Sequence, residues 1–279
     1  MKPMTLVKAH AFGNDFILAE ARGVGPELMA GPSANPSDLA AFARDVCDRH
    51  CGLGADGLIV YHMTGAGATM RLLNADGSRS EVSGNGVRCL AAWIVSQRGV
   101  AMPGQQAPID IETEAGVKRL ELLACANGRY TFRAAMGSPE RVALERLDVD
   151  GQAIEAVTLR VGNPQCVVLG PVTEERLQTL GSVLAVHPHF PEGTNVELAT
   201  VEAADRVRIL IWERGVGPTE ASGTGACAAA VAAMQFGGAA RDVQVASPGG
   251  VQRVEWTDQG LFLTGWAELV AEAAWLRPR

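Results

Sequence analysis

Short apolar segments alternate with turn-forming residues along most of this chain, and the pattern predicts a protein built mainly from β-strands. The segments are rich in Val, Ile, Leu and Thr and are bounded by Gly, Asn, Asp or Pro, as strands usually are. The expected strands are residues 5–9, 16–19, 58–62, 69–73, 109–113, 118–125, 129–134, 156–161, 166–169, 195–201, 206–212, 243–246, 252–256 and 261–266.

Four segments instead predict helices. One opens at Asn35 and runs to about Arg49, and residues 173–180 form a shorter one. The other two, residues 86–97 and 225–236, are apolar on nearly every face, and glycine follows soon after each. A helix that is apolar all round is buried, so we expect each of these two at the centre of a strand-rich domain.

The two central helices begin in matching loops and indicate an internal repeat. Ser83-Gly84-Asn85-Gly86 opens the first helix, and Ser222-Gly223-Thr224-Gly225 opens the second about half a chain later. The same offset relates Asn74 to Glu213 and Glu81 to Glu220. Such a repeat usually means duplicated structural units.

The repeat predicts an α/β fold of the α+β type with two pseudo-symmetric domains, each a mixed, barrel-like sheet around its buried helix. The expected domains are residues 1–130 and residues 131–267, with residues 268–279 returning to the first. A pseudo-twofold axis would bring both serine–glycine loops into the interdomain cleft, where ligands commonly bind.

The composition of the chain argues against several classes of function and partner. The 279 residues carry 24 basic and 31 acidic side chains, a net charge of −7, which argues against a nucleic-acid or anionic-membrane partner. We expect no signal peptide, because residues 1–11 lack the apolar stretch of one, and we expect no membrane span, because no apolar run approaches the necessary length. The six cysteines include no CxxC pair, so we expect reduced thiols in a cytoplasmic protein.

The two serine–glycine loops carry the strongest chemical signal. The first backbone amides of a helix have no intrahelical acceptor, and with the helix dipole behind them they suit an anion such as a carboxylate. Serine is also a common helix N-cap, which is the plain interpretation of a single loop. Two loops related by a repeat favour a single anion held between two helix N-termini.

Other motifs are weaker. Gly223, Gly225 and Ala228 match a dinucleotide fingerprint, but no hydrophobic strand precedes them and no βαβ unit follows. Neither serine loop forms a GxSxG elbow. Cysteine and histidine in residues 47–51, and the histidine pair in residues 187–189, have no matching cluster elsewhere, so we expect no metal.

Polar residues at strand ends form a further group. The repeat maps them to the same cleft as the loops, although Asn is a common turn residue. Neutral amides, one carboxylate and one guanidinium provide donors for a carboxylate and acceptors for an ammonium group. The group therefore suits a small zwitterionic substrate, an amino acid. Its members are Asn14, Asn74, Asn163, Asn195, Glu213 and Arg214.

Together these residues resemble the pyridoxal-independent diaminopimelate epimerase family. The resemblance implies an isomerase without a cofactor, acting as a homodimer, that interconverts LL- and meso-diaminopimelate for lysine and cell-wall precursor synthesis. The matching segments follow the family's order: residues 8–16, 49–57, 74–78, 83–89, 162–164, 190–197, 212–217 and 222–227, with 249–250 and 263–267 similar to its final segments.

The resemblance also implies a mechanism. Inverting a stereocentre needs one group to remove the α-proton and another to deliver a proton to the opposite face. In the family both groups are cysteines at helix starts, where the N-terminus favours the thiolate. The family pattern implies that Asn14, Asn74, Asn163, Asn195, Glu213 and Arg214 bind the substrate, together with Gly84, Asn85, Gly223 and Thr224 of the loops.

This chain departs from the family at both catalytic positions, where it has serine. The expected catalytic residues are Ser83, Ser222 and Glu213, and Gln165 stands where the family usually has histidine. Serine is seldom ionised without an adjacent base, whereas a thiol has a pKa of about 8.5. Several alternatives stay open: serines introduced to trap a complex, a natural branch that retains activity, a protein that only binds a diamino acid, or a racemase of another amino acid.

Overall fold

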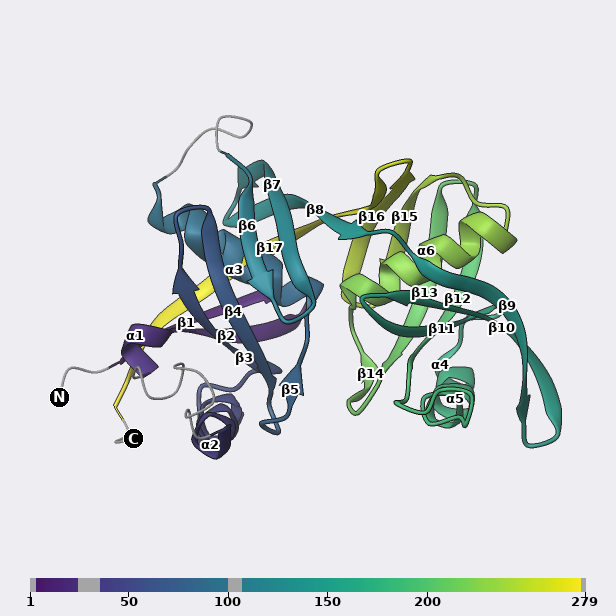
Figure 1. Ribbon diagram of the computed structural model, residues 1–279, viewed down its shortest axis with the longest axis horizontal. Helices are drawn as coiled ribbons and strands as arrows, with labels where there is room; N and C mark the ends of the chain where they lie inside the picture. The colour runs from purple at the N-terminus through teal and green to yellow at the C-terminus, as the bar shows by residue number, and fades with distance from the viewer. Residues whose placement is uncertain (1–3, 25–35, 100–106, 277–279) are drawn as a thin grey trace. The chain divides into compact units, whose positions relative to one another are not determined.

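The computed structural model describes residues 4–24, 36–99 and 107–276 and divides into two compact units (Figure 1). Unit 1 comprises Met1–Phe132 and Trp266–Arg279, and unit 2 comprises Arg133–Gly265. The chain leaves unit 1 within strand β8 (Arg129–Gly137) and returns to it within strand β17 (Gly260–Trp275).

Unit 1 is a β-barrel. Its pairing order is β17–β1–β2–β3–β4–β6–β7, and β8 neighbours both β7 and β17, so that in the described residues an 8-strand series closes on itself. The β2–β3 and β4–β6 pairs are parallel. The remaining bounds are β1 (Met4–Ala11), β2 (Asn14–Glu20), β3 (Gly57–Met63), β4 (Gly67–Asn74), β5 (Arg79–Ser80), β6 (Ile109–Thr113) and β7 (Gly116–Ala126).

Unit 2 repeats this arrangement. Its pairing order is β9–β10–β11–β12–β13–β15–β16–β17, with parallel pairs β11–β12 and β13–β15 at the places that match the parallel pairs of unit 1. This shared order confirms the predicted repeat of two pseudo-symmetric halves. The bounds are β9 (Glu140–Val149), β10 (Gln152–Val161), β11 (Asn163–Leu169), β12 (Asn195–Ala203), β13 (Arg206–Glu213), β14 (Gly217–Thr219), β15 (Asp242–Ser247) and β16 (Gly250–Thr257).

Each unit holds one buried helix, as the apolar pattern predicted. Helix α3 (Gly84–Gln97) is buried from Asn85 through Ala92, and helix α6 (Gly223–Phe236) is buried from its first residue through Ala233. In α6 nearly every buried side chain is Ala, Gly, Cys or Val, which lets the surrounding strands approach closely. Burial of apolar surface on all sides stabilises both helices inside their sheets.

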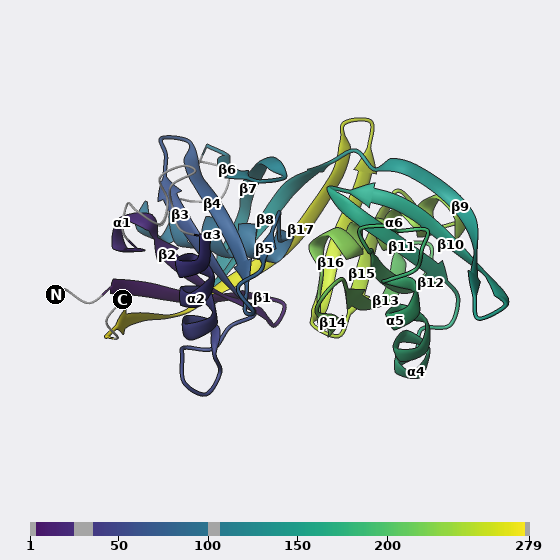
Figure 2. The ribbon, with the colours of Figure 1, turned by 60° about the horizontal axis from the view of Figure 1, so that its bottom comes forward.

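The remaining helices cover the outer faces of the sheets. Helix α2 (Pro36–Cys47) packs Leu39, Ala43 and Val46 against apolar residues of β1, β2 and β3. In unit 2, α4 (Glu174–Arg176), a π-helical turn over Leu177–Gly181 and α5 (Ser182–Leu184) lie together at the outer side, while α6 runs inside the strands (Figures 1 and 2). The short α1 (Ala21–Val24) follows β2.

Strand alternation in β12 decides which side chains face α6. Val196 and Leu198 join the outer core with Leu177 and Leu184. The intervening Glu197 points the other way and reaches Gly225 of α6. Because side chains alternate across a strand, this places Asn195 and Glu197 on the helix side of the sheet.

Several elements differ from the prediction. Strand β9 and the second half of β17 were not expected, and the helical segment after Thr173 continues to Leu184. Helix α2 is confirmed, although its predicted first residue, Asn35, lies outside the described residues. Among the described residues, every helix is too short or too polar to span a bilayer.

Candidate functional site

Both serines cap the helices that follow them. The Gly86 amide donates a hydrogen bond to Ser83 Oγ at 3.1 Å, and the Gly225 amide donates to Ser222 Oγ at 3.2 Å. The two serines have extended backbone, as N-cap residues do. The plain N-cap interpretation is therefore correct for each loop, and the third amide of each helix is not available to a ligand.

The amides that precede the third one in each helix are the part of the predicted anion site that is still open to a ligand. Within the described residues, the amides of Gly84, Gly223 and Thr224 donate to no acceptor. Each group points out of a helix N-terminus, where the dipole favours negative charge. Ser222 is only 3% exposed, whereas Ser83 is half-buried. The expected meeting of the two loops in one cleft stays a prediction.

Hydrogen bonds hold Asn14 on both sides of its amide. Asn85 Nδ2 donates to Asn14 Oδ1 at 3.2 Å, and Asn14 Nδ2 donates to Asp56 Oδ2 at 2.8 Å. Asn85 Oδ1 in turn accepts from the guanidinium of Arg88, which is fully buried over the ring of Phe12. Unit 1 thus brings two of the predicted binding residues, Asn14 and Asn85, into contact at the start of α3.

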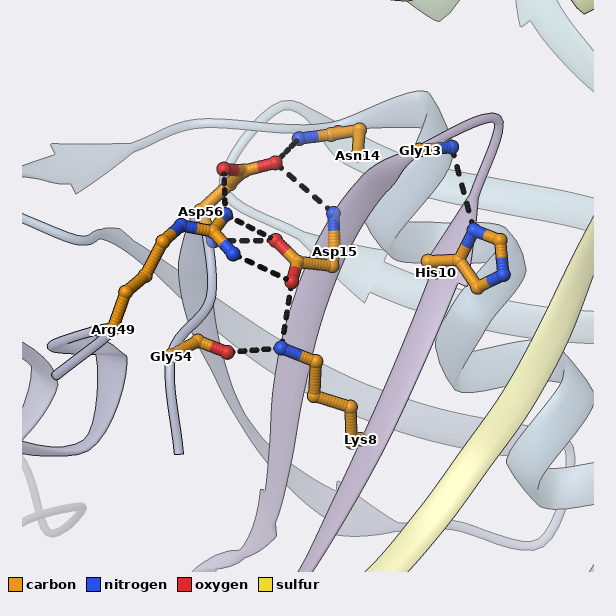
Figure 3. A network of polar contacts seen from close by, with 8 residues as sticks. All are labelled: Lys8, His10, Gly13, Asn14, Asp15, Arg49, Gly54 and Asp56. Carbon is orange, nitrogen blue, oxygen red and sulfur yellow. Dashed lines mark hydrogen bonds and ion pairs between the residues drawn. The ribbon is translucent and has the colours of Figure 1, made fainter. Parts of the chain in front are cut away.

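A cluster of charges anchors Asp56 (Figure 3). Arg49 Nη2 lies 2.7 Å from Asp56 Oδ1 and 2.8 Å from Asp15 Oδ1, and Lys8 Nζ lies 2.6 Å from Asp15 Oδ2. Burial raises the pKa of Asp15, but the hydrogen bonds and charges of Arg49 and Lys8 outweigh it and hold the pKa below its ordinary 3.8. The ionised cluster fixes Asp56, which in turn orients the Asn14 amide.

Asn74 lies at the same end of the unit 1 barrel. Its Nδ2 donates to Ser78 Oγ at 2.9 Å, and its backbone amide donates to the Ser78 carbonyl at 2.8 Å. The next amide, of Ala75, donates to the Asp56 carbonyl at 2.9 Å. The Asn74 turn is therefore tied to the loop that carries Asp56 and lies close to the Asn14 network.

In unit 2 the matching barrel end gathers Asn163, Asn195 and Arg214. Gln165 Nε2 donates to Asn163 Oδ1 at 2.5 Å, and the Arg214 amide donates to Asn195 Oδ1 at 2.8 Å. Gln165 and Asn195 are paired across the parallel strands β11 and β12. The Arg214 guanidinium donates to the Glu192 carbonyl at 2.8 Å. Gln165 therefore orients the Asn163 side chain.

Glu197 is a residue that the sequence analysis missed. It is fully buried, and among the described residues neither carboxyl oxygen has a hydrogen-bond partner. Burial, and secondly the charge of Glu213 on the neighbouring strand, raise its pKa well above the ordinary 4.5. A single acidic residue within the otherwise apolar segment 196–199 was the signal that could have identified it.

The helix cysteines cannot take the place of the serines. Cys89 and Cys227 are fully buried within α3 and α6, and burial raises the pKa of Cys89 far above its usual range. The described residues also hold no group of three or more His, Cys, Asp or Glu side chains placed to bind a metal ion. The serine loops remain the groups to consider for proton transfer.

Solved structures with the same fold define the class of this protein. A hydroxyproline epimerase from Agrobacterium vitis, with bound trans-4-hydroxy-L-proline, matches with a TM-score of 0.73 over 98% of this chain and 91% of that one, at 16% identity. A PhzF-family phenazine biosynthesis protein from Bacillus anthracis matches with a TM-score of 0.68 over 99% and 100%, at 17% identity. The chain thus has the duplicated fold that these two proteins share.

Within that class, the chain belongs to the diaminopimelate epimerase family. The model of this family, "Diaminopimelate epimerase", matches residues 6–142 and 157–270. A diaminopimelate epimerase from Desulforudis audaxviator is 40% identical over 98% of this chain and 100% of its own length. One from Desulfitobacterium hafniense is 38% identical over 96% of each chain.

Proposed function

We propose that this protein is a diaminopimelate epimerase that interconverts the LL and meso isomers by proton transfer at one α-carbon. The observation that carries the proposal is that the family match covers both halves of the repeat, including both serine-capped helices. The relatives bear the name of this epimerase, which does not favour the binding-protein or other-racemase alternatives.

The helix loops and the residues at the strand ends would bind different parts of the substrate. The amides of Gly84, Asn85, Gly223 and Thr224 would hold the carboxylate at the reacting carbon, because helix N-termini stabilise anions. Asn14, Asn74, Asn163, Asn195, Glu213 and Arg214 would bind the remaining groups of the substrate. A bidentate guanidinium suits a carboxylate, and amide and carboxylate oxygens accept from ammonium groups.

Proton transfer would fall to Ser83 and Ser222, each serving one face of the α-carbon, with Glu213 beside the second. The two hydroxyls start helices whose dipoles favour negative charge, which helps an alkoxide to form. A serine remains a weaker acid than a thiol, so we expect slower turnover than a cysteine pair would give. The reaction needs no pyridoxal phosphate in this proposal.

The proposed activity also suggests where the enzyme acts and how it assembles. We propose that it acts in the cytoplasm on a free amino acid in the synthesis of lysine and cell-wall precursors, and that it forms a homodimer. Sedimentation of the full chain would test the dimer, and a single species of monomer mass over a wide concentration range would contradict it.

The activity is tested directly with LL-diaminopimelate. The protein is incubated with this isomer, and the meso isomer is measured over time by chiral chromatography. A Ser83→Ala, Ser222→Ala double variant is the control, because it lacks both hydroxyls but keeps the binding side chains. We expect meso product from the wild type and none above background from the control. Equal conversion by both, or by neither, would contradict the proposal.

A further inference from the structure

Glu197 lies directly under the first turn of α6, close to Ser222. A β-carbon placed on Gly225 would lie 2.6 Å from Glu197 Oε1 and 3.2 Å from Ser222 Cβ. Real β-carbons essentially never approach another atom as closely as 2.6 Å, so any side chain at this position would require the Glu197 carboxyl group to move. Glu197 and Ser222 therefore both lie against Gly225, on the side where a side chain would be.

The carboxyl group has no competing partner. Both oxygens are fully buried and accept or donate no hydrogen bond within the described residues, a costly state for a polar group. A carboxyl that makes no hydrogen bond loses none when its side chain turns toward Ser222. Buried polar groups left in this state call for a functional explanation.

The surroundings of the carboxyl group favour its protonated form. Burial and the charge of Glu213 on β13 raise the pKa of Glu197 well above 4.5. Cys166 on β11 is a second titratable neighbour, and burial followed by the charge of Glu197 raises the pKa of its thiol. The first turn of α6 contributes no acidic residue and one positive dipole end. The raised pKa of Glu197 favours its protonated form, the state that a general acid needs.

Among the described residues of unit 1, no carboxyl group takes the corresponding place. A β-carbon placed on Gly86 would meet the side chains of Ile59 and Phe16 and the Cβ of Ser83, with no carboxyl among them. Ile59 on β3 takes the place that Glu197 takes on β12, facing the glycine in the first turn of the buried helix. The two serines therefore have different surroundings: among the described residues, the glycine in the first turn of α6 has a carboxyl group against it and the matching glycine of α3 does not.

We propose that Glu197 is the proton partner of Ser222, a positioning residue that acts on the substrate only through the serine hydroxyl. When the α-carbon is protonated, the Ser222 O–H bond breaks as the new C–H bond forms. The proton of Glu197 then moves to Ser222 Oγ and leaves a carboxylate. In the reverse direction, Oγ takes the α-proton while the hydroxyl proton passes to that carboxylate. This inference rests on the proposed epimerase activity and explains how serine can replace a more acidic group on one face.

The test is a double-mutant cycle between residues 197 and 222. Glu197→Gln keeps the shape and the neutral charge but cannot transfer a proton. General acid–base groups contribute roughly 100-fold or more, so we expect kcat for LL-diaminopimelate to fall by about that factor with serine at 222. In the Ser222→Cys background, where the thiol needs no partner, Glu197→Gln should change kcat by less than about threefold.

A purely structural role predicts a different pattern. Loss of packing would lower kcat by the same factor with serine or cysteine at position 222, and that result would overturn the inference. Glu197→Leu, which removes an unpartnered polar group, provides a second folded variant, and its thermal unfolding and circular dichroism report on the fold. We expect it to unfold no earlier than the wild type while losing kcat as Glu197→Gln does. A fully active Glu197→Leu variant would refute the inference.

The pH profile separates this inference from the proposed function. In the direction of reaction in which Ser222 delivers the proton, the wild type should lose kcat on the alkaline side as Glu197 ionises, and Glu197→Gln should lack that limb. Unchanged turnover and pH dependence in Glu197→Gln, in a wild type that converts the substrate, would refute the role of Glu197 alone. Absence of conversion by the wild type would refute the proposed activity and this inference with it.

Discussion

Replacing both serines by cysteine should raise activity and lower stability at the same time. Each serine oxygen accepts a hydrogen bond from a helix amide, at 3.1 Å for Ser83 and 3.2 Å for Ser222. A thiol sulfur is a weak acceptor, so Ser→Cys removes most of the cap. Loss of an N-cap costs about 0.5–2 kcal/mol, which lowers Tm by roughly 2–4 °C per kcal/mol in a protein of this size.

The chemistry should change in the opposite direction. A thiol with an ordinary pKa of about 8.5, placed at a helix N-terminus, forms its conjugate base far more readily than an alcohol does. We expect the Ser83→Cys, Ser222→Cys double variant to epimerise LL-diaminopimelate faster than the wild type. The effects of the two substitutions on turnover should be non-additive: the change in the double variant should differ from the product of the changes in the two single variants. The reason is that inversion needs both faces of the α-carbon to be served.

The assay pairs chiral chromatography of the product with calorimetric unfolding of each variant. A double variant that is less stable but faster would support the account. A variant that binds the substrate as tightly as the wild type, shown by titration calorimetry, yet converts it no faster would refute the assignment of the serines to proton transfer. Unchanged Tm values in all three variants would refute the capping argument.

Three further perturbations have defined outcomes. Because the pKa of Glu197 is raised, its stabilising contribution is present below pH 4.5 and is lost as the pH rises. The free energy of unfolding of Glu197→Leu should therefore increase relative to that of the wild type as the pH rises. Urea titrations should show a difference of at most about 1.4 kcal/mol per pH unit. Asp56→Ala removes the acceptor that orients Asn14, so KM should rise more than kcat falls. The free energy of unfolding in urea should fall by about 1 kcal/mol. An unchanged KM would contradict the role of Asp56. Gly225→Ala should cost about 1–3 kcal/mol because its β-carbon would meet the buried Glu197, whereas Gly65→Ala, with open space around it, should leave Tm unchanged.

The barrel strands and both central helices could be predicted because their patterns are local. Apolar segments end at glycine or asparagine turns, and two helices without a polar face can only be buried. The second half of β17 could not be predicted in this way. Its sequence is rich in Ala and Glu, which favour helix, but pairing with β1 from Met4 to His10 holds it extended.

The polar site was predictable only in part. Asn14, Asn195 and Arg214 stand in recognisable motifs at strand ends, so their types and positions indicated a binding role. The capping of the helices by Ser83 and Ser222 was one of two interpretations, and backbone geometry was needed to choose. The isolation of Glu197 depends on what surrounds it in three dimensions.

The central claim, that two groups serve opposite faces of one carbon, is tested most directly by proton exchange in deuterated water. Unlabelled LL-diaminopimelate is converted by the wild type in D₂O, and both isomers are analysed by mass spectrometry during the first few per cent of reaction. A second group that draws its proton from solvent should place one deuteron in nearly every meso molecule, while the remaining LL isomer stays unlabelled. Early meso product that retains the original proton would contradict the two-group mechanism.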